Sequence, residues 1–136
     1  MGAEPRPSLY TGRDFLRRGM PMPESSTPFR IVLTSAGSTR QASHLAQSLV
    51  EERLAACVTV LCGATSIYRW KGQIESANEC VLLIKTTDEL LPALEKRLKE
   101  LHSYETPEFL VLKVEGGSAE YLAWLKSSVG ISPEAT

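Results

Sequence analysis

Hydrophobic and polar residues alternate along the middle of the chain in the pattern of one long β-hairpin, from Ala56 to Thr87. The first strand runs from Cys57 through Trp70, the Lys71-Gly72 pair supplies the turn, and the second strand continues from Gln73 to Lys85. A strand of about 13 residues is roughly 43 Å long, whereas the flanking helical patterns, of about 15 residues each, cover only about 22 Å. The far half of the hairpin, from Ser66 to Glu75, is therefore predicted to project beyond its own domain.

This far half carries large apolar side chains, namely Ile67, Tyr68, Trp70 and Ile74. A two-stranded ribbon has no core of its own in which to bury them, and exposed apolar surface of this size usually marks a contact with another molecule. We therefore expect another copy of the chain to cover the ribbon, so that the protein is an obligate oligomer.

The segment before the hairpin has the pattern of a strand followed by a helix. Phe29 to Thr34 is a short apolar strand, and Ser38 begins a helix, with Gln41 three residues later in a capping-box position. The apolar residues of this helix recur at helical spacing, which predicts one buried face: Ala42, Leu45, Ala46, Leu49 and Val50.

After the hairpin, Thr86 and Glu89 form a second capping-box candidate at the start of another helix, which ends near His102. Its apolar stripe consists of Leu91, Leu94, Leu98 and Leu101. Phe109 to Glu115 is predicted to be the last strand, and Ser118 is predicted to cap a short final helix. That helix carries Tyr121, Leu122 and Leu125 on one side, with Trp124 beside them.

The order of elements predicts an α+β fold, a ferredoxin-like βαββαβ sandwich with an extended β-hairpin and an added C-terminal helix. Residues 29–136 would form this domain, and residues 1–28, which hold five of the eight prolines, are predicted to be a flexible extension. With the register of a two-residue turn, one sheet face would carry Val58, Val60, Cys62, Val81 and Leu83. Both faces of the sheet would then carry apolar side chains that must be buried, which again favours packing between subunits.

Composition excludes several classes of partner. The chain has 136 residues and a net charge of −1, which favours neither nucleic acid nor an acidic membrane surface as a partner. Its apolar runs are too short for a membrane-spanning helix. Three cysteines without a disulfide-framework spacing, and no signal peptide, predict a reduced, cytoplasmic protein.

The cysteines are interpreted as small buried hydrophobic residues. In the register set by the turn, Cys62 lies opposite Val81 and Cys57 lies opposite Thr86. Cys80 then faces away from Cys62, unless a bulge near Gly63-Ala64 shifts the register.

The candidate chemistry lies in the connection between the second helix and the last strand, which holds His102, Tyr104, Glu105 and Glu108. An imidazole close to carboxylates can hold a borderline transition metal. The alternative is that His102 only caps the helix C-terminus. No nucleophile-base arrangement or phosphate-binding loop is present, so we expect no enzymatic activity and no organic cofactor.

Several segments of the chain together resemble the CutA divalent-cation tolerance family. They are Glu52-Arg-Leu-Ala-Ala-Cys-Val58, Ser66-Ile-Tyr-Arg-Trp-Lys-Gly72, Leu83-Ile-Lys-Thr-Thr87, Leu101-His-Ser-Tyr-Glu-Thr-Pro-Glu108 and Tyr121-Leu-Ala-Trp-Leu125. The resemblance extends from about Phe29 to Val129. It implies a tight homotrimer whose hairpins pair across subunit boundaries, an architecture like that of PII signalling proteins, and a cytoplasmic role in metal tolerance.

The resemblance also implies binding of copper(II) or another divalent cation, with His102, Glu105 and Glu108 as the expected ligands. Thr34 and Leu101 stand where bacterial members can have a cysteine and a second histidine, so the affinity is expected to be modest. The expected contacts between subunits involve Tyr68, Trp70, Lys71, Lys85, Tyr104 and Trp124.

Two other functions remain open. In one, a PII-like regulatory trimer binds a small anion or a partner protein in its intersubunit clefts, through Lys71, Lys85 and the aromatic residues. In the other, the trimer acts only as a scaffold.

Overall fold

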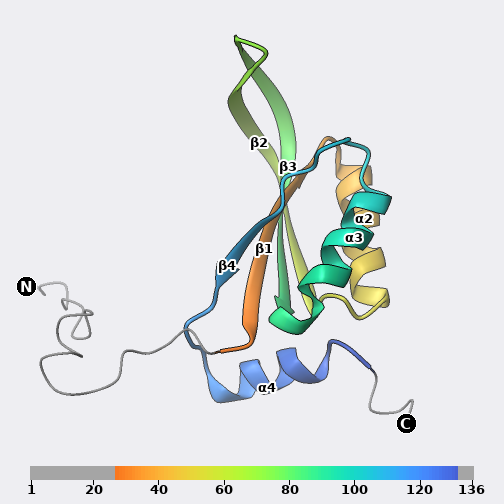
Figure 1. The fold of residues 1–136 in the computed structure, drawn as a ribbon, viewed down its shortest axis with the longest axis vertical. Coiled ribbons are helices and arrows are strands. Elements are labelled where there is room, and N and C mark those ends of the chain that lie inside the picture. The colour runs from red at the N-terminus through yellow and green to blue at the C-terminus, as the bar shows by residue number, and fades with distance from the viewer. Residues whose placement is uncertain (1–26, 132–136) are drawn as a thin grey trace, which may run out of the picture.

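The computed structural model describes residues 27–131, which form one antiparallel sheet with helices on one of its faces (Figure 1). Along the chain the elements are β1 (Phe29–Ala36), α2 (Thr39–Glu51), β2 (Cys57–Trp70), β3 (Gln73–Thr87), a 3-10 turn (Asp88–Leu90), α3 (Leu91–Leu101), β4 (Leu110–Lys113) and α4 (Ala119–Ser127). The strand order is β2-β3-β1-β4, with antiparallel neighbours throughout. This confirms the predicted ferredoxin-like βαββαβ sandwich with a long hairpin and an added C-terminal helix.

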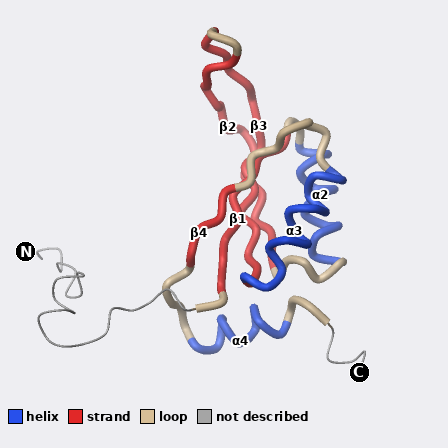
Figure 2. Tube along the Cα trace, viewed as in Figure 1, coloured by secondary structure: helices blue, strands red, loops and turns tan. Residues whose placement is uncertain are grey.

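The main core lies between the sheet and the two helices α2 and α3, which lie side by side on one face (Figure 2). Its fully buried side chains come from both layers: Val32, Leu82 and Ile84 from the strands, and Leu45, Leu49, Leu94 and Leu98 from the helices. Burying a side chain of this size stabilises the fold by about 1.5–3 kcal/mol. The apolar stripes predicted for both helices therefore hold this layer on the sheet, except that Val50 of α2, predicted on the buried face, is 40% exposed.

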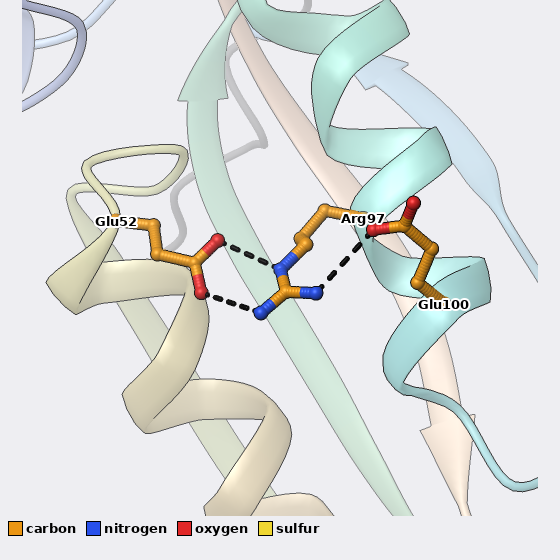
Figure 3. A network of polar contacts seen from close by, with 3 residues as sticks. All are labelled: Glu52, Arg97 and Glu100. Atoms are coloured by element: carbon orange, nitrogen blue, oxygen red, sulfur yellow. Dashed lines mark hydrogen bonds and ion pairs between the residues drawn. The ribbon is translucent and has the colours of Figure 1, made fainter.

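An ion-pair network ties the two helices together on their solvent side (Figure 3). The guanidinium of Arg97 donates from Nε to Glu52 Oε1 at 2.8 Å and from Nη2 to Glu52 Oε2 at 3.0 Å, and its Nη1 lies 3.3 Å from Glu100 Oε1. The hydrogen bonds from Arg97 lower the pKa of Glu52 below its usual value. Because both partners are exposed, this network orients the helices more than it stabilises them.

A smaller core lies where α4 crosses the end of the sheet, and it consists of Phe29, Ala56, Leu125 and Val129. Arg53 fastens the segment after α4 to this corner. Its Nε donates to the carbonyl of Gly130 and its Nη2 to the carbonyl of Ser127, both at 2.8 Å. Arg53 adopts a positive φ of 60°, so the chain accepts an unfavourable backbone conformation where this side chain reaches α4.

Two of the three predicted helix caps are present. The hydroxyl of Ser38 accepts from the backbone N–H of Gln41 at 3.1 Å, and that of Ser118 accepts from Tyr121 at 3.3 Å. The amide of Gln41 does not complete a capping box, because it donates to the carbonyl of Leu101.

The capping box predicted at Thr86 and Glu89 is wrong. The chain first makes a 3-10 turn after Thr87, with no side-chain cap, and α3 begins at Leu91. The hydroxyl of Thr86 is buried and donates to the carbonyl of Leu54 at 2.8 Å, so a tertiary contact takes the group that the cap would have used. The last strand is also shorter than predicted, since β4 spans only Leu110–Lys113.

The hairpin turn is as predicted, but the strand register is not constant. Lys71 and Gly72 both have positive φ, as a tight hairpin turn requires, and Trp70 pairs with Gln73. This register holds as far as Ala64, and a β-bulge between Leu61 and Ala64 then shifts it by one residue. Cys57 therefore pairs with Lys85 instead of Thr86, and Val81 lies opposite Leu61 instead of Cys62.

The shift changes which side chains share a face. Val58 and Val60 pair with Ile84 and Leu82 on the helix side of the sheet, whereas Val81 and Leu83 point to the other side, contrary to prediction. Cys62 and Cys80 now meet and form a disulfide, and Cys57 is the free cysteine. The interpretation of all three cysteines as unpaired hydrophobic residues is therefore wrong for Cys62 and Cys80, and the chain is not fully reduced in this structure.

Two apolar surfaces remain uncovered in the single chain. The far half of the hairpin extends past the helices, as predicted (Figure 1), and leaves Ile67, Trp70 and Ile74 more than half exposed, at 71%, 59% and 62%. The second uncovered apolar surface is the sheet face opposite α2 and α3. It carries the side chains that alternate with the core positions: Ile31, Leu33, Leu61, Leu83, Leu110 and Leu112.

The predicted extension, residues 1–28, lies outside the described residues except for its last two. The hydroxyl of Thr27 donates to the carbonyl of Val114, and the carbonyl of Pro28 accepts from the backbone N–H of Asp88 at 2.7 Å. These bonds attach the two residues before β1 to the segments that follow its neighbouring strands, since Val114 follows β4 and Asp88 follows β3. Among the described helices, none is long and apolar enough to cross a membrane.

Candidate functional site

The candidate site lies at the end of β1, where the connection from α3 to β4 passes over it. His102 is the C-cap residue of α3, as the alternative interpretation predicted, and its backbone N–H bonds to the carbonyl of Leu98. Its side chain is buried. The ring Nε2 lies 2.6 Å from the carbonyl oxygen of Ser35, and Nδ1 accepts from the backbone N–H of Tyr104 at 2.9 Å.

These two bonds fix the tautomer of His102. Because Nδ1 accepts a hydrogen bond, the proton must be on Nε2, which donates to Ser35. Both ring nitrogens are therefore engaged, and a metal ion could bind the imidazole only by displacing one of these partners. The ring of Tyr104 packs against the imidazole, with 4.7 Å between centroids.

Tyr104 extends this cluster to a carboxylate on the neighbouring strand. Its hydroxyl donates to Glu79 Oε2 at 2.9 Å, and the hydroxyl of Ser35 donates to the same oxygen at 3.3 Å. Burial, and then the hydrogen bond and the negative charge of Glu79, raise the pKa of Tyr104 above its usual value. The phenol therefore stays protonated and keeps its role as a donor.

Gly37 gives the tyrosine its space. A Cβ at this position would lie 3.0 Å from the hydroxyl oxygen of Tyr104, closer than a packed carbon comfortably approaches. A side chain at residue 37 would therefore crowd the phenol at the position from which it donates to Glu79.

Thr34 lies on the opposite, helix-covered face of β1. It is fully buried, and its hydroxyl has no hydrogen-bond partner among the described residues. An unpaired buried hydroxyl is costly and rare in folded proteins. A hydroxyl is also a poor substitute for the cysteine thiolate expected here from the family resemblance.

The other predicted metal ligands, Glu105 and Glu108, lie on the exposed side of the same connection. Residues 27–131 contain no group of three or more histidine, cysteine, aspartate or glutamate side chains that is able to hold a metal ion. One chain by itself therefore does not present His102, Glu105 and Glu108 as a ready-made metal centre.

The residues predicted to contact other subunits lie in separate places on the chain. Tyr68, Trp70 and Lys71 are at the tip of the hairpin, where the Lys71 ammonium lies 5.9 Å from the centroid of the Trp70 ring. Tyr104 lies near the end of β1, as described above. Lys85 and Trp124 are at the opposite end of the sheet.

Lys85 and Trp124 meet through Tyr121, which sequence reasoning had placed only in a helix stripe. The Lys85 ammonium lies 3.2 Å from the Tyr121 hydroxyl, and the Tyr121 and Trp124 rings are 5.3 Å apart. The hydrogen bond with Tyr121 raises the pKa of Lys85, so this end of the sheet carries a fixed positive charge beside two half-exposed aromatic rings.

Sequence reasoning missed Glu79 and Ser35 in the candidate site. Glu79 could have been noticed, because it is a charged residue directly before the apolar core run of β3. Ser35 carried no such signal, since its role depends on which strand lies beside β1.

Comparison with known proteins identifies the family. The family model described as "CutA1 divalent ion tolerance protein" matches residues 30–128. The chain belongs to the CutA1 family. The match includes β1 from its second residue, the whole hairpin, the His102 connection and α4, which confirms the resemblance found in the sequence.

Relatives and solved structures agree with this assignment. The "Divalent-cation tolerance protein CutA" of Thermus thermophilus is 46% identical over 100 residues, covering 74% of this chain and 97% of the relative. The protein of the same name from Pectobacterium atrosepticum is 48% identical over 99 residues, covering 73% and 90%. In Arabidopsis thaliana, "Protein CutA, chloroplastic" is 40% identical over 109 residues, covering 79% of this chain and 60% of the relative.

The fold is the same in the solved CutA1 structures. The Thermus thermophilus protein superposes with a TM-score of 0.74 at 45% identity, covering 75% of this chain and 99% of that structure. The CutA1 structure from Oryza sativa gives 0.75 at 37% identity, covering 80% and 100%.

Proposed function

We propose that this chain forms a homotrimer that acts in divalent-cation tolerance, in the cytoplasm and without catalysing a reaction. Membership of the CutA1 family and the names of the relatives support the role in cation tolerance. The main support for the trimer is the uncovered sheet face, because an exposed apolar surface of this extent usually marks a contact with another molecule.

The composition of this face favours a second copy of the chain as the partner. Leu110 and Leu112 on β4 are about half exposed, and they pair with Leu33 and Ile31 in the centre of the sheet. Interfaces of obligate oligomers resemble a domain core cut in half, with few charged groups at their centre. Lys85, at the margin of this face, already has Tyr121 as a hydrogen-bond partner.

The projecting hairpin supports the same assembly. In a ring of three subunits, the far half of one hairpin can reach a neighbour, and its Ile67, Trp70 and Ile74 would then be covered. Sedimentation equilibrium of the full chain should give three times the monomer mass at micromolar concentration. A monomer under these conditions would contradict the proposal.

For metal binding, we propose that copper(II) binds weakly at the connection that holds His102. A neutral imidazole is the strongest ligand there for a divalent first-row ion, and Glu105 and Glu108 offer carboxylate oxygens from the same or an adjoining subunit. Nδ1 is the nitrogen to be released, because its partner is the backbone N–H of Tyr104 in the connection itself. Breaking this bond opposes binding, so the affinity should be modest and should weaken as protons compete for the imidazole.

The test is a calorimetric copper(II) titration of the wild type, His102→Ala and Glu105→Gln/Glu108→Gln. The chain contains two histidines, and the exposed His44 on α2 provides the matched control His44→Ala. We expect His44→Ala to bind like the wild type and His102→Ala to lose the site while remaining trimeric. Equal binding by wild type and His102→Ala would rule out His102 as the anchor.

A second function, a PII-like regulator that binds a small anion between subunits, is favoured by Lys85. Its ammonium stands beside Tyr121 and Trp124, and no carboxylate in residues 27–131 forms an ion pair with it. A thermal-shift screen with nucleotides and carboxylate metabolites distinguishes this function from metal binding. A shift that Lys85→Gln abolishes and His102→Ala preserves would favour the regulator.

A further inference from the structure

The disulfide between Cys62 and Cys80 lies at the base of the projecting hairpin. Leu61 pairs with Val81 in the register of the core, so the next pair along the two strands is Cys62 with Cys80. Their Cα atoms are 3.9 Å apart. Directly after this pair the bulge begins, with Gly63 at a φ of 90°. The disulfide thus joins the last pair of the core register, just before the register changes.

The two sulfurs differ in their access to solvent. Cys62 is exposed on the edge strand β2, whereas Cys80 is 3% exposed and belongs to the main core. A thiol in solution can therefore reach the sulfur of Cys62 and not that of Cys80. This asymmetry is typical of a disulfide that reacts by exchange, because the attack has only one accessible target.

Thr39 stands beside both sulfurs. Its hydroxyl oxygen is 3.6 Å from Cys62 Sγ and 3.9 Å from Cys80 Sγ, and since disulfide sulfurs have no proton, the hydroxyl is the donor. Thr39 is the first residue of α2, where the helix dipole also favours negative charge. A thiolate formed at either sulfur would thus have a hydroxyl donor and a helix N-terminus nearby.

We propose that Cys62 and Cys80 form a reversible thiol–disulfide site for small thiols of the glutathione class. A glutathione thiolate attacks Cys62 Sγ, the Cys62–Cys80 bond breaks, and Cys80 leaves as a thiolate that Thr39 stabilises. A second glutathione thiolate then attacks the sulfur of the bound glutathione and releases Cys62. In total, two glutathione thiols become one glutathione disulfide, and the protein disulfide becomes two thiols after protonation.

Cys80 directly follows Glu79, the hydrogen-bond partner of Tyr104, but the side chains of Cys80 and Glu79 point to opposite faces of β3. Cys62 and Thr39 lie on the helix side of the sheet, opposite the uncovered apolar face, so that covering that face leaves Cys62 accessible. When oxidised, the pair fixes covalently the strand register at the base of the hairpin. When reduced, only backbone hydrogen bonds and packing hold that register.

The first test equilibrates the full chain in glutathione buffers of graded redox potential, followed by acid quenching, alkylation of free thiols under denaturing conditions and intact mass measurement. The variant Cys57→Ser removes the third thiol. We expect one reversible transition between a species with no alkyl group and a species with two. A chain that carries two alkyl groups in every buffer, including excess glutathione disulfide, would overturn the proposal, and so would a disulfide that excess reduced glutathione does not open.

The second test asks which sulfur is attacked. In the Cys57→Ser background, Cys80→Ser should form a mixed disulfide with glutathione disulfide at Cys62, whereas Cys62→Ser should react at least tenfold more slowly through the buried Cys80. Equal rates would contradict the assignment of Cys62.

Thr39 is tested as a positioning residue. Thr39→Val should slow reduction of the disulfide about 3- to 10-fold, the rate equivalent of one modest hydrogen bond, and Thr39→Ser should restore it. Circular dichroism at equal temperature controls for loss of structure. A Thr39→Val rate equal to wild type would remove Thr39 from the mechanism.

Discussion

The two halves of the long hairpin belong to the same two strands and have different surroundings. In the near half, where residues 57–61 pair with 81–85, one face packs against α2 and α3, and burial alternates along β3. In the far half, where residues 64–70 pair with 73–79, most side chains are exposed in the single chain, including Ile67, Trp70 and Ile74. Alternating hydrophobicity therefore predicts a strand in both halves, but it does not tell which half the chain itself covers.

Each half takes its register from a different neighbour. The far half follows the tight turn at Lys71-Gly72, and the near half follows the packing of Leu82 and Ile84 in the core. These two registers differ by one residue, and the bulge between Leu61 and Ala64 reconciles them. A long hairpin can thus take its register from both ends, with the mismatch between the two registers absorbed by a bulge in the middle.

The largest effect is expected from a charge in the far half. Trp70→Glu should dissociate the trimer, because it places a carboxylate on the apolar surface that we propose a neighbour covers. The near half should keep its structure, so that far-ultraviolet circular dichroism changes little. Sedimentation equilibrium measures the assembly.

Ala93→Glu is the matched control for this prediction, since it introduces the same carboxylate on the exposed side of α3, away from the hairpin. It should remain mainly trimeric. A trimeric Trp70→Glu variant would show that the far half does not contribute to assembly.

Two buried threonines test the packing beside the near half: Thr86 on β3 and Thr34 on the neighbouring strand β1. Thr86 donates to the Leu54 carbonyl, whereas Thr34, equally buried, has no partner among the described residues. Thr86→Val should lower the free energy of unfolding by about 1 kcal/mol, because it leaves the partly buried carbonyl of Leu54 without this donor. Thr34→Val should be neutral or stabilising by about 1 kcal/mol, since it removes a buried hydroxyl that makes no bond.

Urea denaturation at one fixed protein concentration measures both variants, so that mass action on the trimer cancels. The opposite sign for the two changes is the essential result. Equal losses would mean that the Thr34 hydroxyl also has a partner in the assembled protein.

The smallest effect concerns the helix layer that covers only the near half. The pKa of Glu52 is lowered by its hydrogen bonds from Arg97, so its stabilising contribution is present above the usual glutamate pKa of 4.5. The contribution is lost as the pH falls through the lower pKa of the folded state. Arg97→Gln should thus be slightly less stable than wild type at pH 7, and this difference should disappear in acid.

The control for the ion pair is Lys99→Gln, whose partner Glu95 lies on the same helix. It does not connect the two helices, so the link between α2 and α3 should be unaffected. A difference between Arg97→Gln and wild type that stays constant between pH 7 and pH 3 would attribute the effect to lost packing instead of charge.

The sequence was sufficient to predict the order of elements, the turn and the projecting far half, because these depend on local chemistry: periodicity, a Lys-Gly turn and strand length. It was not sufficient for the bulge. The residues around Gly63 allow two registers, and the packing of Leu82 and Ile84 in the core selects the one in which Cys62 meets Cys80. The capping role predicted for Thr86 failed for a similar reason, since the Leu54 carbonyl lies far away in sequence.

The candidate site was predictable only in part. The position of His102 at a helix end follows from the apolar stripe that stops before it. The engagement of both its nitrogens does not, because one partner, the carbonyl of Ser35, comes from β1. Glu79 joins Tyr104 across the same tertiary contact.

The bulge also bears on how the protein avoids unlimited association. β2 is an edge strand of 14 residues, and an edge of that length, if straight, is a template on which further strands can stack into fibres. A bulge bends its strand and increases the local twist. The free edge is thereby divided into two shorter segments that point in different directions, and a strand that pairs with one segment cannot continue straight along the other. A single extra residue thus turns an open-ended edge into one suited to a closed assembly.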